Sequence, residues 1–315
     1  MAIVPDTAKP GIINQALLRI RPNREIVHAP FLKMLLESPG IHSKLFGSAG
    51  GSAIKNVRPL AAIRKVKFLL PPLSEQKRIA EILDRAEALR AKRRAALALL
   101  DELTQSIFLD MFGDPVTNPK GWEVAKFQQL CSRVTVGIVV KPASYYVESG
   151  VAALRSLNVK PGKIVMENLV FFSQQDNDVT LKKTKLKAGD LVLVRSGQPG
   201  NCAVISKELD GINAIDLLIA SPNAEAANST FLCEFFNSAG GRDLVLSKQR
   251  GQIQKHLNVG ELNSALIPIP PLTIQREFES RVKSTEELKS SVKSSLTELD
   301  QLFASLQHRA FRGEL

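Results

Sequence analysis

This chain has few of the residues that mark metal centres or disulfide-stabilised secreted domains. Its three cysteines, Cys131, Cys202 and Cys233, lie far apart and form no CxxC pair, which excludes a zinc ribbon and favours a reducing cytoplasm. The four histidines are scattered and give no metal-binding constellation. No stretch reaches the roughly 20 apolar residues of a membrane span, and the N-terminus lacks an export signal. We therefore expect a cytoplasmic protein without a membrane segment or a bound metal.

Catalytic motifs are also missing. The sequence has no P-loop, GxGxxG, HExxH or GxSxG pattern. The glycine-rich stretch 47–52 lacks the Lys-Ser/Thr ending of a phosphate-binding loop, and Asn118-Pro119-Lys120 does not replace the Asn-Pro-Pro-aromatic loop of adenine methyltransferases. We expect no catalytic residue and no cofactor on this chain.

A positive charge is present, and its distribution is uneven. The net charge is +11, which favours contact with nucleic-acid phosphates although many basic proteins bind none. Residues 1–73 hold 11 basic and 3 acidic groups, and residues 115–269 hold 17 and 13. Residues 74–112 and 270–315 each hold 7 and 7. The excess charge therefore lies on the segments that read as globular.

The chain contains an internal repeat. At an offset of 200, Leu17-Leu18 matches Leu217-Leu218 and Phe31-Leu32 matches Phe231-Leu232. After a one-residue slip, Pro71-Pro72-Leu73 matches Pro270-Pro271-Leu272. One register kept over about a hundred residues indicates a duplication. Met1 aligns near residue 201 and Val4 matches Val204, but residues 113–210 otherwise have no counterpart. We therefore expect the first lobe to lack its front half, either because the gene is shortened or because the chain is a fragment.

Two segments have a heptad pattern and predict long helices at 74–112 and 273–311. Each would have about 39 residues and extend roughly 58 Å at 1.5 Å per residue. We expect the two helices to pair as an antiparallel coiled coil; the alternative is that each packs on its own lobe. The predicted seam positions are Ile79, Ile82, Ala86, Leu89, Ala96, Leu100, Leu103 and Ile107 in the first helix, and Val282, Thr285, Leu288, Val292, Leu299, Leu302 and Leu306 in the second.

The expected fold class is α+β, with mixed lobes joined to these helices. Residues 1–73 form the incomplete first lobe and residues 115–270 the complete second lobe. Within the second lobe, short apolar runs predict strands at 191–194 and 202–205, and short helices are expected at 230–237 and 240–247. Trp122 is expected to be a core anchor.

Several motifs, taken in order, resemble the specificity subunits of Type I restriction–modification systems. The motifs that support the resemblance are Pro71-Pro72-Leu73-Ser74-Glu75-Gln76-Lys77-Arg78-Ile79 with its repeat at 270–275, Pro119-Lys120-Gly121-Trp122-Glu123, the run from Gly189-Asp190 to Gly200, and Gln254-Lys255-His256-Leu257-Asn258-Val259. Each motif alone is weak, but their order and duplication are specific. The resemblance covers the chain except the missing front of the first lobe.

The resemblance implies a non-catalytic subunit that recognises a bipartite site in double-stranded DNA. It implies two target-recognition domains and two conserved spacer helices that fix the gap between the half-sites. It also implies two methyltransferase subunits, which carry S-adenosylmethionine, and ATP-dependent restriction subunits as partners. The incomplete first lobe leaves self-association open, as for a half-size subunit acting as a dimer.

Base reading needs Arg or Lys for guanine and Asn or Gln for adenine. Three donor clusters in the second lobe are therefore the predicted DNA-binding residues: Lys141, Tyr145, Arg155, Ser156 and Asn158; Arg195, Ser196 and Gln198; and Lys248, Arg250, Gln252, Gln254, Lys255 and His256. The basic run Lys182, Lys183, Lys185 and Lys187 is expected to be a solvated strand face. Arg90, Lys92, Arg93 and Arg94 are expected on a solvated or partner-facing side of the first helix.

The main alternative is an interaction protein whose coiled coil dimerises and whose basic lobes bind something other than DNA. A second alternative is the recognition part of a fused restriction–methylation enzyme, which the absent methyltransferase domain disfavours. Salt-dependent binding to duplex DNA separates the first alternative from the resemblance.

Overall fold

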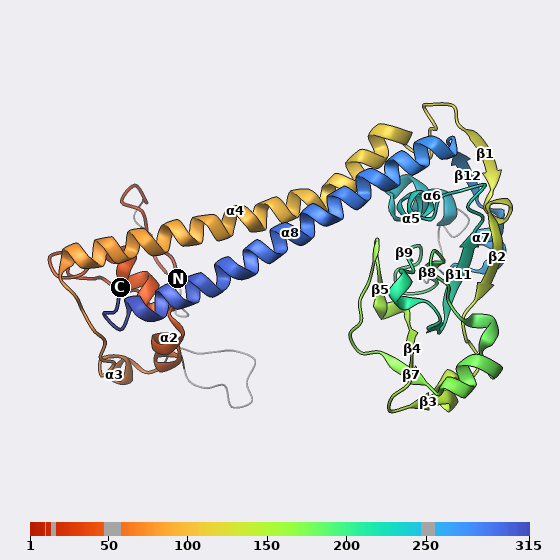
Figure 1. Cartoon of the computed structure of the whole chain (residues 1–315). Coiled ribbons are helices and arrows are strands. Elements are labelled where there is room, and N and C mark those ends of the chain that lie inside the picture. The colour runs from red at the N-terminus through yellow and green to blue at the C-terminus, as the bar shows by residue number, and fades with distance from the viewer. Residues whose placement is uncertain (10, 14–16, 47–57, 247–255) are drawn as a thin grey trace. The chain divides into compact units, whose positions relative to one another are not determined.

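The structure is a computed structural model that describes residues 1–315 except 10, 14–16, 47–57 and 247–255. The chain divides into two compact units, and each is described by itself (Figure 1). Unit 1 consists of residues 1–99 and 288–315, and unit 2 of residues 100–287. Each long helix is divided between the two units, whereas the sequence treats the helices as segments of their own.

Unit 2 contains all the named strands. They are β1 (Glu123–Lys126), β2 (Cys131–Val136), β3 (Tyr146–Val147), β4 (Val151–Leu154), β5 (Val159–Lys160), β6 (Lys163–Ile164), β7 (Val170–Phe172), β8 (Leu191–Val194), β9 (Cys202–Val204), β10 (Asn213–Ala214), β11 (Leu217–Pro222) and β12 (Leu266–Ile269). Its helices within the lobe are α5 (Ser229–Asn237), α6 (Ala239–Leu246) and α7 (Val259–Ser264). The predicted strands at 191–194 and 202–205 and the two short helices are therefore confirmed.

The central sheet of unit 2 has the strand order β2-β11-β8-β9, and all its pairs are antiparallel. Because side chains alternate along a strand, Leu191 and Leu193 of β8 pack on one side with the phenylalanines of α5. Val192 and Val194 pack on the other side with Leu154 and further apolar residues. Both faces of β8 are therefore buried. A second sheet has the order β10-β4-β7-β3.

Unit 1 is helical in its described part. Its short helices are α1 (Ala29–Glu37), α2 (Pro39–Leu45) and α3 (Leu60–Ile63). Their core consists of Phe31, Leu35, Leu36, Ile41 and Leu45 packed on Ile79, Ala80 and Leu83 of the first long helix and on Ala310 of the second. Unit 1 contains the helical half of a lobe without a described strand.

The two predicted long helices are confirmed as α4 (Leu73–Phe112) and α8 (Leu272–Ala310), and they pack together in antiparallel orientation. In unit 1, Arg90 contacts Asp300 at 2.6 Å, and its guanidinium lies 4.4 Å from the ring centre of Phe303. In unit 2, the rings of Phe108 and Phe278 are 5.7 Å apart. Low-numbered residues of α4 thus face high-numbered residues of α8, and the reverse holds at the other ends.

The seam between the helices matches the predicted one only in part. Ile79, Ala86, Leu100 and Thr285 are buried as expected. Leu89 and Leu103 of α4 and Leu288 and Leu302 of α8 were expected in the seam, but they are 49%, 38%, 51% and 50% exposed. Counted from Ile79, the inward positions of α4 come after steps of four, three and four residues: Leu83 and Ala86 are buried, and Arg90 contacts Asp300 of α8. The sequence favoured the leucines because they are apolar. Helix packing instead places Arg90 inward against Asp300, while Arg93 stays exposed and reaches Ser295.

Each helix begins with the same buried glutamine, which confirms the duplication. Gln76 accepts a hydrogen bond from the backbone N–H of His28 and donates to the carbonyls of Ile26 and Pro71. Gln275 accepts from the N–H of Asn228 and donates to the carbonyl of Pro270. Both side chains are fully buried. The repeated Pro-Pro-Leu-x-x-Gln motif therefore ties each long helix to the segment that enters its lobe.

Helix α4 ends where the sequence predicts. Gly113 has φ +79°, and a Cβ there would lie 2.5 Å from the ring of Pro119, so glycine is required. The indole N–H of Trp122 donates to the carbonyl of Phe112 at 3.0 Å. Trp122 is half-buried, and it anchors the end of the helix. Among the described residues, no helix has the length and apolarity to span a bilayer.

Two leucines of α4 test the seam. Leu83 is fully buried, so Leu83→Ala should lower the free energy of unfolding by about 2–4 kcal/mol. Leu89→Ala, the matched change at a half-exposed site on the same helix, should cost less than about 1 kcal/mol. Urea denaturation followed by circular dichroism measures both. A larger loss at Leu89 than at Leu83 would restore the seam expected from the sequence.

Candidate nucleic-acid interface

The short segment Ile215-Asp216 brings several predicted site residues together at one end of the central sheet. The N–H of Asp216 donates to the carbonyl of Ile138, which lies just beyond β2. The N–H of Ile215 donates to the carbonyl of Leu154, directly before Arg155. Leu217 pairs with Val194, directly before Arg195. The chain segments that carry Lys141, Arg155 and Arg195 therefore leave from the same place.

Arg195 is held between an acid and a histidine. Its Nη1 lies 2.6 Å from Oδ1 of Asp216, and its Nη2 lies 2.8 Å from Nε2 of His256. The Arg195 side chain is 16% exposed, whereas that of Asp216 is 45% exposed. The backbone carbonyl of Arg195 also accepts from the N–H of Leu257. Two of the three predicted clusters are thus in contact, and the guanidinium has a fixed orientation.

Hydrogen bonds between its own residues hold the loop after β8. The N–H of Gly200 donates to the carbonyl of Val194, and the amide of Asn201 donates to Oε1 of Gln198 at 3.0 Å. Gly200 has φ +90°, a conformation that favours glycine. Gln198 is exposed and Ser196 is half-buried on this loop. The loop therefore presents polar groups from a defined backbone.

The segment after β2 carries Lys141 and Tyr145. Lys141 is exposed and has φ +43°. Its carbonyl accepts from both the N–H and the hydroxyl of Ser144. The ring of Tyr145 packs against Phe172 of the second sheet, with centroids 6.4 Å apart. Lys141 is thus open to a ligand, whereas Tyr145 is partly used in packing.

Asn158 has a structural role in place of the predicted DNA contact. Its side chain is fully buried; Oδ1 accepts from the N–H of Arg155, and Nδ2 donates to the carbonyls of Val165 and Glu167. Every polar atom of this amide is therefore already used. The sequence could not distinguish it from a solvent-facing asparagine. Arg155 donates to the carbonyl of Asn168, and Ser156 is half-buried.

Five residues of the third cluster lie outside the described residues: Lys248, Arg250, Gln252, Gln254 and Lys255. Their predicted DNA contacts stay predictions. His256, the remaining member, is exposed and lies beside Arg195.

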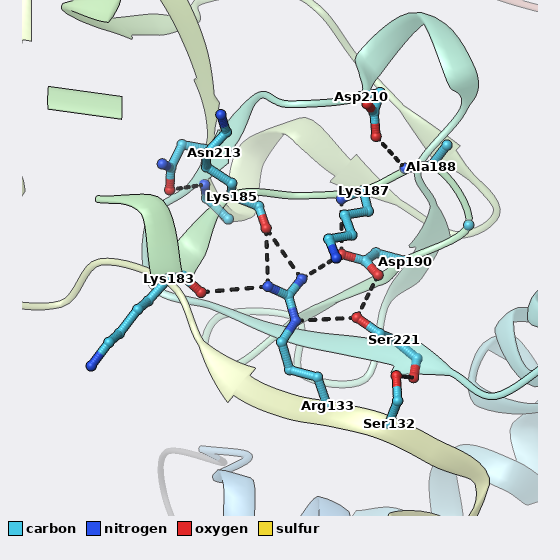
Figure 2. A network of polar contacts seen from close by, with 12 residues as sticks. Ser132, Arg133, Lys183, Lys185, Lys187, Ala188, Asp190, Asp210, Asn213 and Ser221 are labelled. Atoms are coloured by element: carbon cyan, nitrogen blue, oxygen red, sulfur yellow. Dashed lines mark hydrogen bonds and ion pairs between the residues drawn. The ribbon is translucent and has the colours of Figure 1, made fainter. Parts of the chain in front are cut away.

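The basic run 182–187 is not the strand face expected from the sequence. Residues Lys182–Thr184 form a short helix, η5, and the chain then turns into β8. Figure 2 shows the network that holds this turn, with Arg133 of β2 at its centre. Arg133 donates to the carbonyls of Lys183 and Lys185 and pairs with Asp190 at 2.6 Å. Arg133 thus binds the backbone carbonyls of these lysines. The spacing of the lysines in the sequence could not show this contact.

Asp190 completes the network from a buried position. Its Oδ1 accepts from the hydroxyl of Ser221 at 2.6 Å, and its Oδ2 also accepts from the N–H of Lys187 at 2.9 Å. Burial, followed by the charge of Asp190, raises the pKa of the nearby Cys131 thiol to about 12. At neutral pH this thiol is therefore protonated and is a poor nucleophile.

Sequence reasoning missed three residues at this end of the sheet. Asp216 was overlooked because an acid is not expected beside DNA, although its partner Arg195 was predicted. Val139 and Val140 follow Ile138 and are 49% and 74% exposed. Apolar side chains in a loop carry no signal in a search for polar donors.

Comparison with known proteins gives consistent matches. A family model described as the Type I restriction modification DNA specificity domain matches residues 3–98. The specificity subunit of the Type I restriction enzyme EcoBI from Escherichia coli is 22% identical, over 98% of this chain and 70% of its own length. The EcoKI specificity subunit from Escherichia coli strain K12 is 24% identical, over 94% and 67%.

Solved structures share the fold. A chain from a structure of a type I R-M system superposes with a TM-score of 0.63 at 19% identity, covering 94% of this chain and 74% of that one. The HsdS subunit from Thermoanaerobacter tengcongensis gives a TM-score of 0.51 at 20% identity, covering 94% and 73%.

The mixed sheets and the paired long helices are thus a fold that this chain shares with these solved structures. The sequence comparisons confirm the resemblance predicted from the motifs, which is to the specificity subunits of Type I restriction–modification systems.

The Arg133–Asp190 pair gives a test of how the basic turn is held. Asp190→Ala leaves Arg133 without its carboxylate in a partly buried place, and should lower the free energy of unfolding by about 3 kcal/mol or more. The matched change Asp178→Ala breaks the more exposed pair with Lys185 and should cost less than about 1 kcal/mol. Denaturant titrations of both variants measure the difference. A loss in Asp190→Ala as small as the one expected for Asp178→Ala would mean that the buried pair stabilises unit 2 no more than an exposed one.

Proposed function

We propose that this chain is a DNA-recognition specificity subunit of a Type I restriction–modification system. The convergence of oriented donors at Ile215-Asp216 carries the proposal, together with the similarity to specificity subunits. The net charge of +11 supports it, because cations that neutralise phosphates supply most sequence-independent affinity for DNA. Double-stranded DNA is the proposed ligand of unit 2.

The proposed contacts divide between phosphates and bases. Arg195 is compensated by Asp216, so the pair adds little net charge toward the phosphates. Its fixed guanidinium is suited to guanine, whose O6 and N7 are two acceptors in the major groove. Lys141 is exposed, and no described residue forms an ion pair with it, so it is suited to a phosphate. Ser196, Gln198 and His256 are proposed as further polar contacts around Arg195.

The chain is proposed to have no catalytic role and no cofactor of its own. Methylation would come from two methyltransferase subunits that carry S-adenosylmethionine, and cleavage from ATP-dependent restriction subunits. The relatives are subunits of such enzymes by their names, which supports partners of this kind. The proposed place of action is the cytoplasm. The predicted bipartite target also belongs to this proposal.

Two measurements test the function itself. The chain should bind duplex DNA with an affinity that falls steeply as salt is raised. Co-expression with the cognate methyltransferase should yield methylated adenines within one sequence motif across a genome. A stable complex with the methyltransferase that leaves no such motif would contradict the proposal.

The division of labour between Arg195 and Lys141 is also testable. Arg195→Ala should weaken binding to the mapped target about 10- to 100-fold, with little change in the salt slope, because a bidentate base contact contributes about 1–3 kcal/mol. Lys141→Ala should weaken binding to all duplexes and reduce the salt slope by about 1. Arg281→Ala, at an exposed pair on α8, is the control and should change neither. Fluorescence anisotropy at several salt concentrations measures all three. A uniform loss across sequences in Arg195→Ala would overturn its assignment to base reading.

A further inference from the structure

The residues before α1 expose apolar side chains whose repeat counterparts are buried. Leu17 and Leu18 are 61% and 42% exposed, whereas Leu217 and Leu218 of β11 are fully buried. Ile3 and Ile20 are 47% and 46% exposed, whereas Ala203 and Ala220 are fully buried. The repeat register is therefore kept in the sequence, but the burial is not.

The backbone of the same segment also lacks its partners. In unit 2, β11 is hydrogen-bonded on one edge to β2 and on the other to β8. Among the described residues, residues 17–22 form no backbone hydrogen bond with another segment. Backbone N–H and C=O groups in a folded domain are almost always paired. Residues 17–22 thus have the sequence of a central strand, but neither neighbouring strand is found in the described part of unit 1.

A third segment of unit 1 also exposes apolar side chains at positions that are covered in unit 2. Residues 67–70 correspond to β12, which pairs with β1 in unit 2. Ile267 of β12 is fully buried, whereas its counterpart Phe68 is 38% exposed. Leu69 is 62% exposed. The strands that cover β9, β11 and β12 in unit 2 are β1, β2 and β8, and all three lie within residues 113–200.

A cavity marks where such a partner would pack on unit 1. It has a volume of about 330 Å³ and is lined by residues before α1, by the first residues of α1 and by the start of α4, including Ile3, Val4, Ala29 and Leu73. In unit 2, Ser229 is the counterpart of Ala29, and its hydroxyl donates to the carbonyl of Gly189. The equivalent position is therefore covered in unit 2 by the segment that has no counterpart in unit 1.

We propose that residues 3–4, 17–22 and 67–70, here called the open strand segments, form a docking surface for a polypeptide segment of the same kind as residues 113–200. That segment would add one strand on each side of residues 17–22 and a further strand beside residues 67–70. Unit 1 then becomes a complete lobe with its own central sheet. This mode of binding is β-strand addition, in which main-chain hydrogen bonds give affinity and alternate side chains give specificity. The proposal does not depend on DNA binding.

The test uses the full chain with a second copy of residues 113–200 placed directly before Met1. Residue 200 of the copy then joins Met1 as Gly200 joins Asn201 in unit 2. Hydrogen exchange read by mass spectrometry follows residues 17–22 and 67–70. In the chain without the addition, these amides should exchange as in an unprotected chain. In the fusion, their exchange should slow by about 100-fold or more, toward the rates of residues 217–222.

Matched substitutions separate docking from general stabilisation. Leu18→Lys should leave the unfused chain unchanged, because this side chain is exposed, and should abolish the protection gained in the fusion. Leu218→Lys, at the buried counterpart, should unfold unit 2 in both proteins. A fusion carrying Leu193→Lys in the added copy should gain no protection at residues 17–22.

Three outcomes would overturn the proposal. The first is a fusion in which residues 17–22 exchange as fast as before, whether or not the added copy is itself protected. The second is slow exchange of residues 17–22 in the unfused monomer, which would mean that they are already paired within the chain. The third is slow exchange that appears only with dimer formation in light scattering, which would make a second intact copy the occupant.

Discussion

Strand β11 is paired on both edges, and both ends of this strand carry the polar groups of unit 2. At its start, Asp216 holds the guanidinium of Arg195 beside His256. At its other end, Ser221 shares Asp190 with Arg133 and so holds the basic turn. The candidate interface exists because β2 and β8 flank β11 in a fixed register. In unit 1, the equivalent residues 17–22 form no backbone hydrogen bond with another segment that the structure describes, and Leu17 and Leu18 are exposed.

The contact between α4 and α8 is not fully apolar, unlike the core around β11. Phe108, Phe112 and Phe278 pack together in unit 2, and Phe31 and Leu83 belong to the core of unit 1. In the part of the seam that lies in unit 1, Arg90 takes an inward position and contacts Asp300, and the exposed Arg93 reaches Ser295. A polar group at a seam position lowers stability but fixes register. We infer that these arginines help to set which residues of α4 and α8 face each other.

The candidate interface combines an arginine that is paired with a carboxylate and lysine side chains that are exposed. Arg195 is oriented by Asp216, which suits it to reading a base, whereas an exposed lysine such as Lys141 suits a phosphate. The predicted donors near Arg195 were found because polar residues in loops are visible in the sequence. Asn158 was wrongly included, since its fully used amide depends on the β5–β6 hairpin, which brings Val165 beside it. Asp216 was missed because its role exists only through Arg195.

The sequence by itself determined the repeat, the two long helices with their limits, and the resemblance to Type I specificity subunits. These features are local or periodic, so they can be read from spacing alone. Only the tertiary structure decided which side of each helix faces the other, because steps of three and four residues from Ile79 give two possible seams. It also decided which polar side chains are free. Burial and hydrogen bonding depend on neighbours that are distant in the chain, as the pairs Arg133–Asp190 and Arg195–Asp216 show.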